Sequence, residues 1–287
     1  MIMIVTSAIS HHSVAKDIAH LLEDGQIIIL HPGYFFGALA FRRALEKEHC
    51  KKNVIVADTE SLVYSCRSEI PGEVHIAGVK QSLLVATFPG RDIDLMIEKI
   101  KSIYPQCLPG KNILDTTFGN VNFVLHTPIA LFNAGSIDSK REFLFYYEGG
   151  SPAIMNLEER LDKERLAVAN GFGIKARSIK ELLTDFYGVE GLTLYDVVKK
   201  NPAYAPIKAP QSLQTRLITE DVPMGLVPVA SAAEKLHVNV PLHRLLVDSA
   251  CALMETDYWS QGRTMANLGL AEMDKETILK CLNEGLP

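Results

Sequence analysis

Three segments of the chain contain side chains that could do acid–base or anion-binding chemistry. The first, residues 120–135, includes Asn122, His126 and Pro128. In a helix, positions 122 and 126 lie on one face because they are four residues apart, and Pro128 predicts a kink. Histidine titrates near neutral pH and is the commonest general acid or base. The segment therefore predicts either a histidine at a polar cleft or a hydrogen-bonded histidine in the core.

The second segment, residues 216–226, has Arg216 ahead of two adjacent carboxylates, Glu220 and Asp221. A carboxylate beside a histidine orients the imidazole and stabilises its charged form. A guanidinium can bind a substrate carboxylate through two parallel hydrogen bonds. The structural alternative is that Glu220 or Asp221 caps a helix over residues 225–233 and that Arg216 is only their surface partner.

The third segment, Asp58–Arg67, directly follows an apolar strand expected at residues 53–57. In a doubly wound sheet, ligands bind at the carboxyl ends of the strands, so this loop and the loop 31–33 are expected to face one cleft. A cysteine beside a cation, such as Cys66, is typical of a reactive thiolate. Since no adjacent histidine supports a cysteine nucleophile, we expect Cys66 to line the pocket.

The elements that must position these residues change in character along the chain. Short apolar strands alternate with amphipathic helices in the first third, which is typical of a parallel sheet with helices on both faces. Two strands and one helix follow, at residues 73–80, 83–88 and 92–103. The remaining signals are helical, at residues 120–133, 157–170, 178–185, 228–236, 242–253 and 274–282. Ala134-Gly135 and Gly171 stand where helix C-caps are expected. We therefore predict an α/β domain over residues 1–108 and an all-helical domain over residues 109–287.

Composition excludes several classes of protein. Of the 287 residues, 47% are hydrophobic and 22% are charged, as in ordinary globular proteins. The net charge of −5 argues against nucleic acid as the main partner, because phosphate binding needs a basic face. Apolar stretches such as Ile27–Leu30 are too short to cross a bilayer. The five cysteines form no CxxC pair and His11-His12 has no third ligand, so we expect no metal site, no disulfide framework and a cytoplasmic location.

Together these segments resemble the octopine/nopaline (opine) dehydrogenase family. The resemblance extends from residue 5 to beyond residue 265, in the family's order. The matching motifs are Val5-Thr-Ser-Ala8, His31-Pro-Gly33 with Phe36-Gly-Ala38, Ala57-Asp-Thr59 with Tyr64-Ser-Cys-Arg67, Asn122-x-x-x-His126-x-Pro128 with Asn133-Ala-Gly135, Leu161-Asp-x-Glu-Arg165, Arg216-x-x-x-Glu-Asp-Val-Pro-x-Gly-Leu226 and Gly262-Arg-Thr-x-x-x-Leu-Gly269.

The resemblance implies a two-domain oxidoreductase with a Rossmann nucleotide-binding domain and a helical catalytic domain. Such enzymes condense a 2-oxo acid, often pyruvate, with the amino group of an amino acid. They then use NADH or NADPH, the reduced forms of NAD and NADP, to reduce the imine to an N-(carboxyalkyl) amino acid. The family's catalytic histidine falls on His126 and its orienting aspartate on Asp221. Arg216 matches the arginine that binds substrate carboxylate.

We further expect Asn122 and Cys66 to contribute to substrate binding, and four residues to contact the cofactor: Ser7, Pro32, Gly33 and Asp58. Two positions depart from the family's usual pattern, since His31 replaces an asparagine and Asp58 replaces a glutamate. No G-x-G-x-x-G phosphate loop occurs in the sequence. We therefore expect roughly 60–80 residues of the first βαβ unit to be absent. The strand at residues 3–5 would then have an exposed edge that could form a homodimer.

Two other functions remain open at this stage. The chain could be a ketopantoate reductase-like enzyme that reduces a 2-oxo acid without an amine. It could also be a non-catalytic remnant that binds an amino acid or oxo acid through Arg216, because the phosphate loop is missing.

Overall fold

A five-stranded sheet forms the N-terminal part of the computed structural model, which describes residues 1–68 and 70–286. In spatial order its strands are β1 (Ile2–Ile4), β2 (Ile27–Leu30), β3 (Ile55–Thr59), β6 (Leu83–Phe88) and β7 (Cys107–Pro109). The first three are parallel, as predicted, and β1 stands at one edge of the sheet. The Rossmann-type α/β architecture is thereby confirmed.

One pairing differs from an all-parallel sheet, because β6 runs antiparallel to β3. Between them the chain forms a hairpin of β4 (Tyr64–Arg67) and β5 (His75–Val79), which is a separate two-stranded sheet. A parallel return requires a crossover, usually a helix, and no helix separates β3 from β6 among the described residues. After the hairpin, the chain therefore re-enters the sheet at the end where β3 left it, and β6 runs back beside β3 in the opposite direction.

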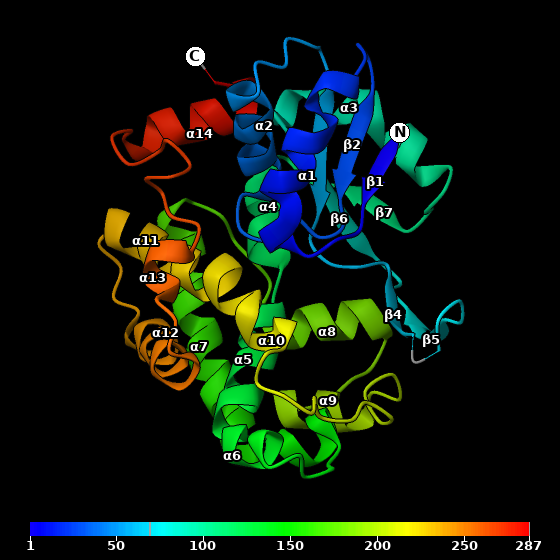
Figure 1. The fold of residues 1–287 in the computed structure, drawn as a ribbon, viewed down its shortest axis with the longest axis vertical. Helices are drawn as coiled ribbons and strands as arrows, with labels where there is room; N and C mark the ends of the chain where they lie inside the picture. Colours follow the sequence, from blue (N-terminus) through cyan, green and yellow to red (C-terminus); the bar gives the residue numbers. More distant parts are fainter. Residues whose placement is uncertain (69, 287) are drawn as a thin grey trace.

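Helices cover both faces of the sheet (Figure 1). On β2, Ile28 and Leu30 join the core that includes α1 (His11–Ile18) and α2 (Gly37–Lys47), while Ile27 and Ile29 pack with residues of α3 (Ile93–Lys101). All four side chains are buried. A strand covered on both faces must be apolar at every position, which explains the unbroken run in the sequence.

The rest of the chain is helical, as predicted, and extends below the sheet in Figure 1. Its helices are α4 (Ile113–Gly119), α5 (Asn122–Phe132), α6 (Ala134–Asp138), α7 (Pro152–Gly171), α8 (Ile179–Tyr187), α9 (Leu194–Lys200), α10 (Arg216–Thr219), α11 (Val227–Lys235), α12 (Pro241–Met254), α13 (Tyr258–Gln261) and α14 (Lys275–Glu284). All six predicted helices are present within a few residues of their expected ends. The C-cap expected at Ala134-Gly135 is wrong, because both residues lie inside α6. The C-cap expected at Gly171 is displaced by one residue, because Gly171 is the last residue of α7 and Phe172 is its C-cap.

The last helix, α14, lies beside α2 of the sheet region in Figure 1. One apolar core runs through both parts, from Ile4 on β1 to Leu282 on α14. The domain division at residue 108 therefore stays a prediction. In the part of the chain that the structure describes, none of the helices combines the length and apolar character needed to cross a membrane.

A buried ion pair joins three of these helices. Arg165 of α7 is fully buried, and its Nε donates to Asp162 Oδ1 at 2.7 Å. Arg165 also donates to the carbonyl oxygens of Phe118 and Arg177, while Asp162 Oδ2 accepts the N–H of Ile179 at 2.8 Å. Removing one member of such a network leaves a buried charge unpaired. The Leu161-Asp-x-Glu-Arg165 motif therefore holds the scaffold together around the site.

Candidate active site

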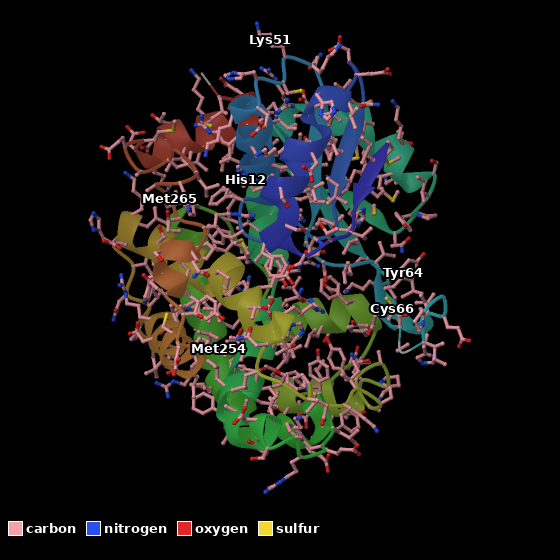
Figure 2. All side chains as sticks on the ribbon, in the orientation of Figure 1. His12, Lys51, Tyr64, Cys66, Met254 and Met265 are labelled. Atoms are coloured by element: carbon pink, nitrogen blue, oxygen red, sulfur yellow. The ribbon has the colours of Figure 1, made fainter. Side chains whose placement is uncertain are left out.

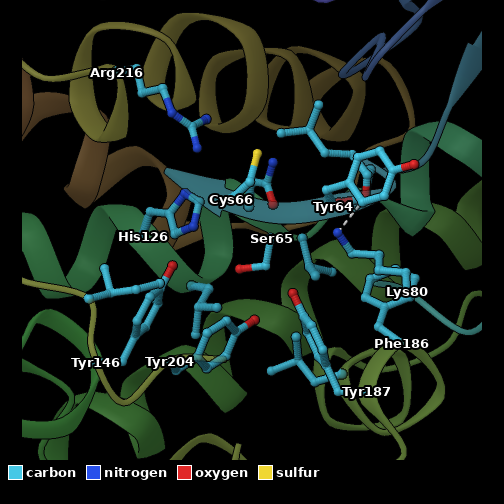
Figure 3. Close-up of a pocket in the computed structure, with 17 residues that line it drawn as sticks. Tyr64, Ser65, Cys66, Lys80, His126, Tyr146, Phe186, Tyr187, Tyr204 and Arg216 are labelled. Carbon is cyan, nitrogen blue, oxygen red and sulfur yellow. Dashed lines mark hydrogen bonds between the residues drawn. The ribbon is translucent and has the colours of Figure 1, made fainter. Parts of the chain in front are cut away.

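A pocket opens where the sheet region meets the helices (Figure 3). Side chains of β4, α5 and α8 line it, together with Arg216 and the three tyrosines Tyr146, Tyr187 and Tyr204. The sequence analysis placed Asn122, His126, Cys66 and Arg216 in one site, and all four line this pocket. Residues from distant segments therefore come together as expected, although their roles stay predictions.

His126 and Asp221 lie within hydrogen-bonding distance. Their Nδ1 and Oδ2 atoms are 2.8 Å apart, and the Asp221 side chain is fully buried. α5 presents His126 on the face that also contains Asn122, one turn earlier. Asp221 does not cap a helix with its side chain, so the capping alternative is not realised for this residue. The arrangement is that of an acid–base histidine oriented by a carboxylate.

Tyr34 completes this arrangement and was not identified from the sequence. Its hydroxyl donates to Asp221 Oδ1 at 2.6 Å, so both carboxylate oxygens are engaged. Burial, together with the charge of Asp221, raises the pKa of Tyr34 well above its ordinary value, which keeps the hydroxyl protonated as a donor. Tyr34 has a φ of 58°, a left-handed conformation that is uncommon outside glycine. The sequence contained one signal for this residue: Tyr34 directly follows His31-Pro-Gly33, the loop expected to face the cleft.

Arg216 is the cation nearest to this pair in sequence. Its Nη1 lies 3.6 Å from Glu220 Oε2, one helical turn away, and its side chain is 43% exposed. Glu220 Oε1 accepts the N–H of Ala8 at 2.6 Å, which ties the loop after β1 to the Arg216 segment. Glu220 therefore orients Arg216 and leaves its guanidinium at the pocket, as Figure 3 shows.

Cys66 stands on β4, at the junction of the two parts of the molecule (Figure 2). It is half-buried and lines both this pocket and a neighbouring cavity of about 590 Å³ under the β4–β5 hairpin. The expected role as a pocket-lining residue agrees with this placement. Among the described residues there is no group of three or more His, Cys, Asp or Glu side chains that could hold a metal ion.

The predicted cofactor contacts lie at the carboxyl ends of β1, β2 and β3. Ser7 follows β1 and is half-buried, whereas Pro32, Gly33 and Asp58 are buried. Asp58 Oδ2 accepts the N–H of Ala38 at 2.9 Å, and its Oδ1 accepts the Thr116 hydroxyl at 2.5 Å. With no exposed surface, Asp58 can influence a cofactor only through the loop that it holds.

The 31–36 loop is packed closely over Asp58. A Cβ added to Gly33 would lie 2.4 Å from the Cβ of Asp58, so only glycine fits there. Arg263, from the Gly262–Gly269 motif, is buried and donates through Nη1 to the carbonyls of Gly33 and Phe35 at 3.1 and 2.5 Å. These contacts fix the loop that presents Tyr34 to Asp221.

Replacing Asp58 with asparagine should change how stability depends on pH. Burial raises the pKa of Asp58 to about 7, against opposing hydrogen bonds from Thr116 and Ala38. Between roughly pH 4 and 7 the folded protein therefore keeps a proton that the unfolded chain has lost, so this group's contribution to stability falls as pH rises. The free energy of unfolding of wild type, relative to Asp58→Asn, should decrease by a few kcal/mol from pH 4 to pH 8.

Urea unfolding followed by circular dichroism at several pH values measures this difference. Other buried groups, such as Glu60, whose burial also raises its pKa to about 7, contribute equally to both proteins and cancel. A constant difference between the two proteins across this range would contradict the prediction.

Comparisons with known proteins agree with this architecture. The family profile described as NAD/NADP octopine/nopaline dehydrogenase, alpha-helical domain, matches residues 109–254. The chain is 38% identical over 271 residues to an opine dehydrogenase of Arthrobacter sp. (strain 1C), covering 94% of this chain and 75% of that protein. It is 28% identical over 233 residues to a vitopine synthase of Allorhizobium ampelinum, covering 80% of this chain and 64% of the relative.

Solved structures show the same fold at low identity. An octopine dehydrogenase with NADH and L-arginine superposes with a TM-score of 0.78 at 20% identity, covering 96% of this chain and 77% of that one. A yersinopine dehydrogenase gives a TM-score of 0.76 at 16% identity, covering 96% and 78%. With the helical-domain match and the 38% identity, the chain belongs to the octopine/nopaline dehydrogenase family of NAD- or NADP-dependent oxidoreductases.

Proposed function

We propose that this protein condenses an amino acid with a pyruvate-like 2-oxo acid and reduces the imine to an N-(carboxyalkyl) amino acid. The observation that supports this most directly is the hydrogen-bonded series Tyr34–Asp221–His126 at the wall of a pocket that also contains Arg216. Family membership supplies the reaction class, and the side chains supply its acid–base and anion-binding groups.

His126 performs the proton transfers. Amine addition to a carbonyl, loss of water and imine reduction all need protons moved near neutral pH, which suits an imidazole. Asp221 accepts a hydrogen bond from the protonated Nδ1 of His126 and stabilises the imidazolium. The Nε2 atom is then the one that exchanges protons with the substrate.

Arg216 binds a substrate carboxylate. Both the amino acid and the 2-oxo acid contain one, and a guanidinium fork matches the two oxygens. Its partner Glu220 is itself held by the Ala8 N–H, so the Arg216 side chain is oriented before substrate arrives. Asn122, one turn before His126, adds a neutral hydrogen-bonding group to the same wall.

The loops after β1 and β2 fit the nicotinamide end of the cofactor. Val5 and Thr6, which follow β1, are exposed. Ser7 comes next, and the N–H of the following residue, Ala8, donates to Glu220, the neighbour of Asp221 in the sequence. NAD(P)H supplies the hydride when bound. Ser7 would form part of its surface, and the buried residues Pro32, Gly33 and Asp58 would hold that surface in place.

An omission experiment tests the proposal. Purified protein is incubated with NADH or NADPH, pyruvate and a panel of amino acids, and absorbance at 340 nm is followed. We expect oxidation only when both organic substrates are present, with the N-(carboxyethyl) product identified by mass spectrometry. Equal oxidation without an amino acid would instead indicate a ketopantoate reductase-like enzyme. Ligand binding without any oxidation would indicate a non-catalytic binding protein.

A further inference from the structure

Lys80 stands at the end of the pocket opposite Arg216 and His126, with Ser65 and Cys66 between them (Figure 3). It follows β5 directly and is only 6% exposed. The proposed condensation uses Arg216, His126 and Asp221, and it gives Lys80 no part. A buried ammonium that lines a substrate pocket without a role is the feature that needs an explanation.

The contacts of Lys80 leave its charge unneutralised. Its Nζ donates to the carbonyl oxygen of Leu62 at 2.5 Å and lies 5.2 Å and 5.9 Å from the ring centroids of Phe186 and Tyr187. An ammonium has three donors, and no ion pair to Lys80 within 4 Å is found in residues 1–68 and 70–286. A buried charge is costly unless an anion accompanies it.

Glu60 is the carboxylate that acts on Lys80 electrostatically, but it has other partners. Its Oε2 accepts from Arg177 at 2.9 Å, and its Oε1 accepts the Leu84 N–H at 2.8 Å. Glu60 also does not line the pocket. Burial lowers the pKa of Lys80 to about 8, so the ammonium is still mostly charged at pH 7.

The charge of the whole lining has one sign. Among the described residues that line the pocket, Lys80 and Arg216 are basic and His126 can become cationic. This set of lining residues contains no aspartate or glutamate. A substrate with a cationic side chain would meet like charges at both ends. A substrate with an extra carboxylate would meet Arg216 at one end and Lys80 at the other.

We propose that Lys80 is an anion subsite that selects a substrate with a third carboxylate, on the side chain of either the amino acid or the 2-oxo acid. This inference rests on the proposed condensation, whose two α-carboxylates are common to all substrates of the reaction. The hydroxyls of Tyr187 and Tyr204, which hydrogen bond to each other, face the same central space in Figure 3 and add polar atoms to the pocket.

Isothermal titration with matched ligand pairs tests the subsite without requiring turnover. The amino-acid pair is L-glutamate and L-glutamine, and the oxo-acid pair is 2-oxoglutarate and its 5-methyl ester, each titrated with and without NADH. In at least one pair, wild type should bind the charged member at least tenfold more tightly, because a charge-assisted hydrogen bond is lost with the neutral amide or ester. The pair that shows the difference identifies which substrate carries the third carboxylate.

Three variants assign the preference to Lys80. Lys80→Met should abolish it by weakening only the charged ligand, and Lys80→Arg should retain it. Lys199→Met is the matched control, because Lys199 also lies over two aromatic rings, at 5.1 and 5.4 Å, but does not line the pocket. Its ligand affinities should equal those of wild type. Thermal unfolding shows whether each variant is folded.

Several results would overturn the inference. Equal or undetectable binding of both members in both pairs would exclude the subsite. An equal loss of glutamate and glutamine affinity in Lys80→Met would show that Lys80 holds the common α-carboxylate instead. The proposed function is tested by a different result. If no NAD(P)H is oxidised, the condensation is refuted, even if the titrations show the preference for the charged ligand.

Discussion

We expect His126→Gln to lower kcat/KM for the proposed NAD(P)H-dependent condensation by a factor of about 10² to 10⁴, with little loss of stability. Glutamine approximates the reach of the imidazole and can hydrogen bond to Asp221, but it cannot accept and return a proton near pH 7. Steady-state oxidation of NAD(P)H at 340 nm measures the loss, with thermal unfolding of the same preparation in parallel.

His243→Gln is the matched control for this variant. His243 is also buried, and its Nδ1 lies 2.8 Å from a carboxylate oxygen, that of Glu164. It belongs to α12 and does not line the pocket. We expect His243→Gln to lower the melting temperature and leave kcat/KM of the folded enzyme within about threefold. Comparable losses of activity in both variants, or unchanged turnover in His126→Gln, would refute the role of His126.

Asp221→Asn is the second large effect, with an expected decrease in kcat by a factor of about 10² to 10⁴. The amide keeps the shape of the side chain and can still accept the Tyr34 hydroxyl at one position. It cannot both accept from Tyr34 and accept the Nδ1 proton of His126, so the histidine is held in the wrong tautomer. The KM for the 2-oxo acid should change little, because Arg216 is untouched.

Tyr34→Phe separates orientation from charge in this experiment. It removes the 2.6 Å hydrogen bond to Asp221 Oδ1 and leaves the 2.8 Å contact with His126 in place. We expect a smaller loss of kcat than in Asp221→Asn and a stability cost of about 1–3 kcal/mol, since one oxygen of a buried carboxylate loses its partner. Retention of wild-type kcat in Asp221→Asn would show that His126 needs no carboxylate partner.

Much of the fold was predictable because its signals are local. The unbroken apolar run at Ile27–Leu30 indicated a strand buried on both faces, and the helical periodicity around His126 placed that side chain on the face it shares with Asn122. Helix ends deviate by only a few residues, because caps and turn residues act within one turn. The exception is Ala134-Gly135. Asn133 separates α5 from the short helix α6, and Gly135 lies inside that second helix instead of ending the first.

The antiparallel return of β6 was not visible in the sequence. Apolar strands at residues 73–80 and 83–88 carry no mark of direction, and only the β4–β5 hairpin, formed between β3 and β6, decided it. Burial of Asp58 was equally hidden, because a carboxylate after a strand is as compatible with an exposed loop as with a packed one. Its hydrogen-bond partners are Ala38 of α2, which precedes Asp58 in the sequence, and Thr116 of α4, which follows it.

The sequence by itself therefore determined the elements, the order of the two parts and, through motif resemblance, which residue types belong to the site. The tertiary structure alone decided the contacts between segments far apart in the chain. His126 and Asp221 are 95 residues apart, and Tyr34 and Asp221 are 187 apart. The role inferred for Lys80 likewise depends on which walls of the pocket lack a carboxylate. Local propensity acts over a few residues, whereas the approach of α5 to the 216–226 segment depends on how whole helices pack, and no short stretch of sequence encodes that distance.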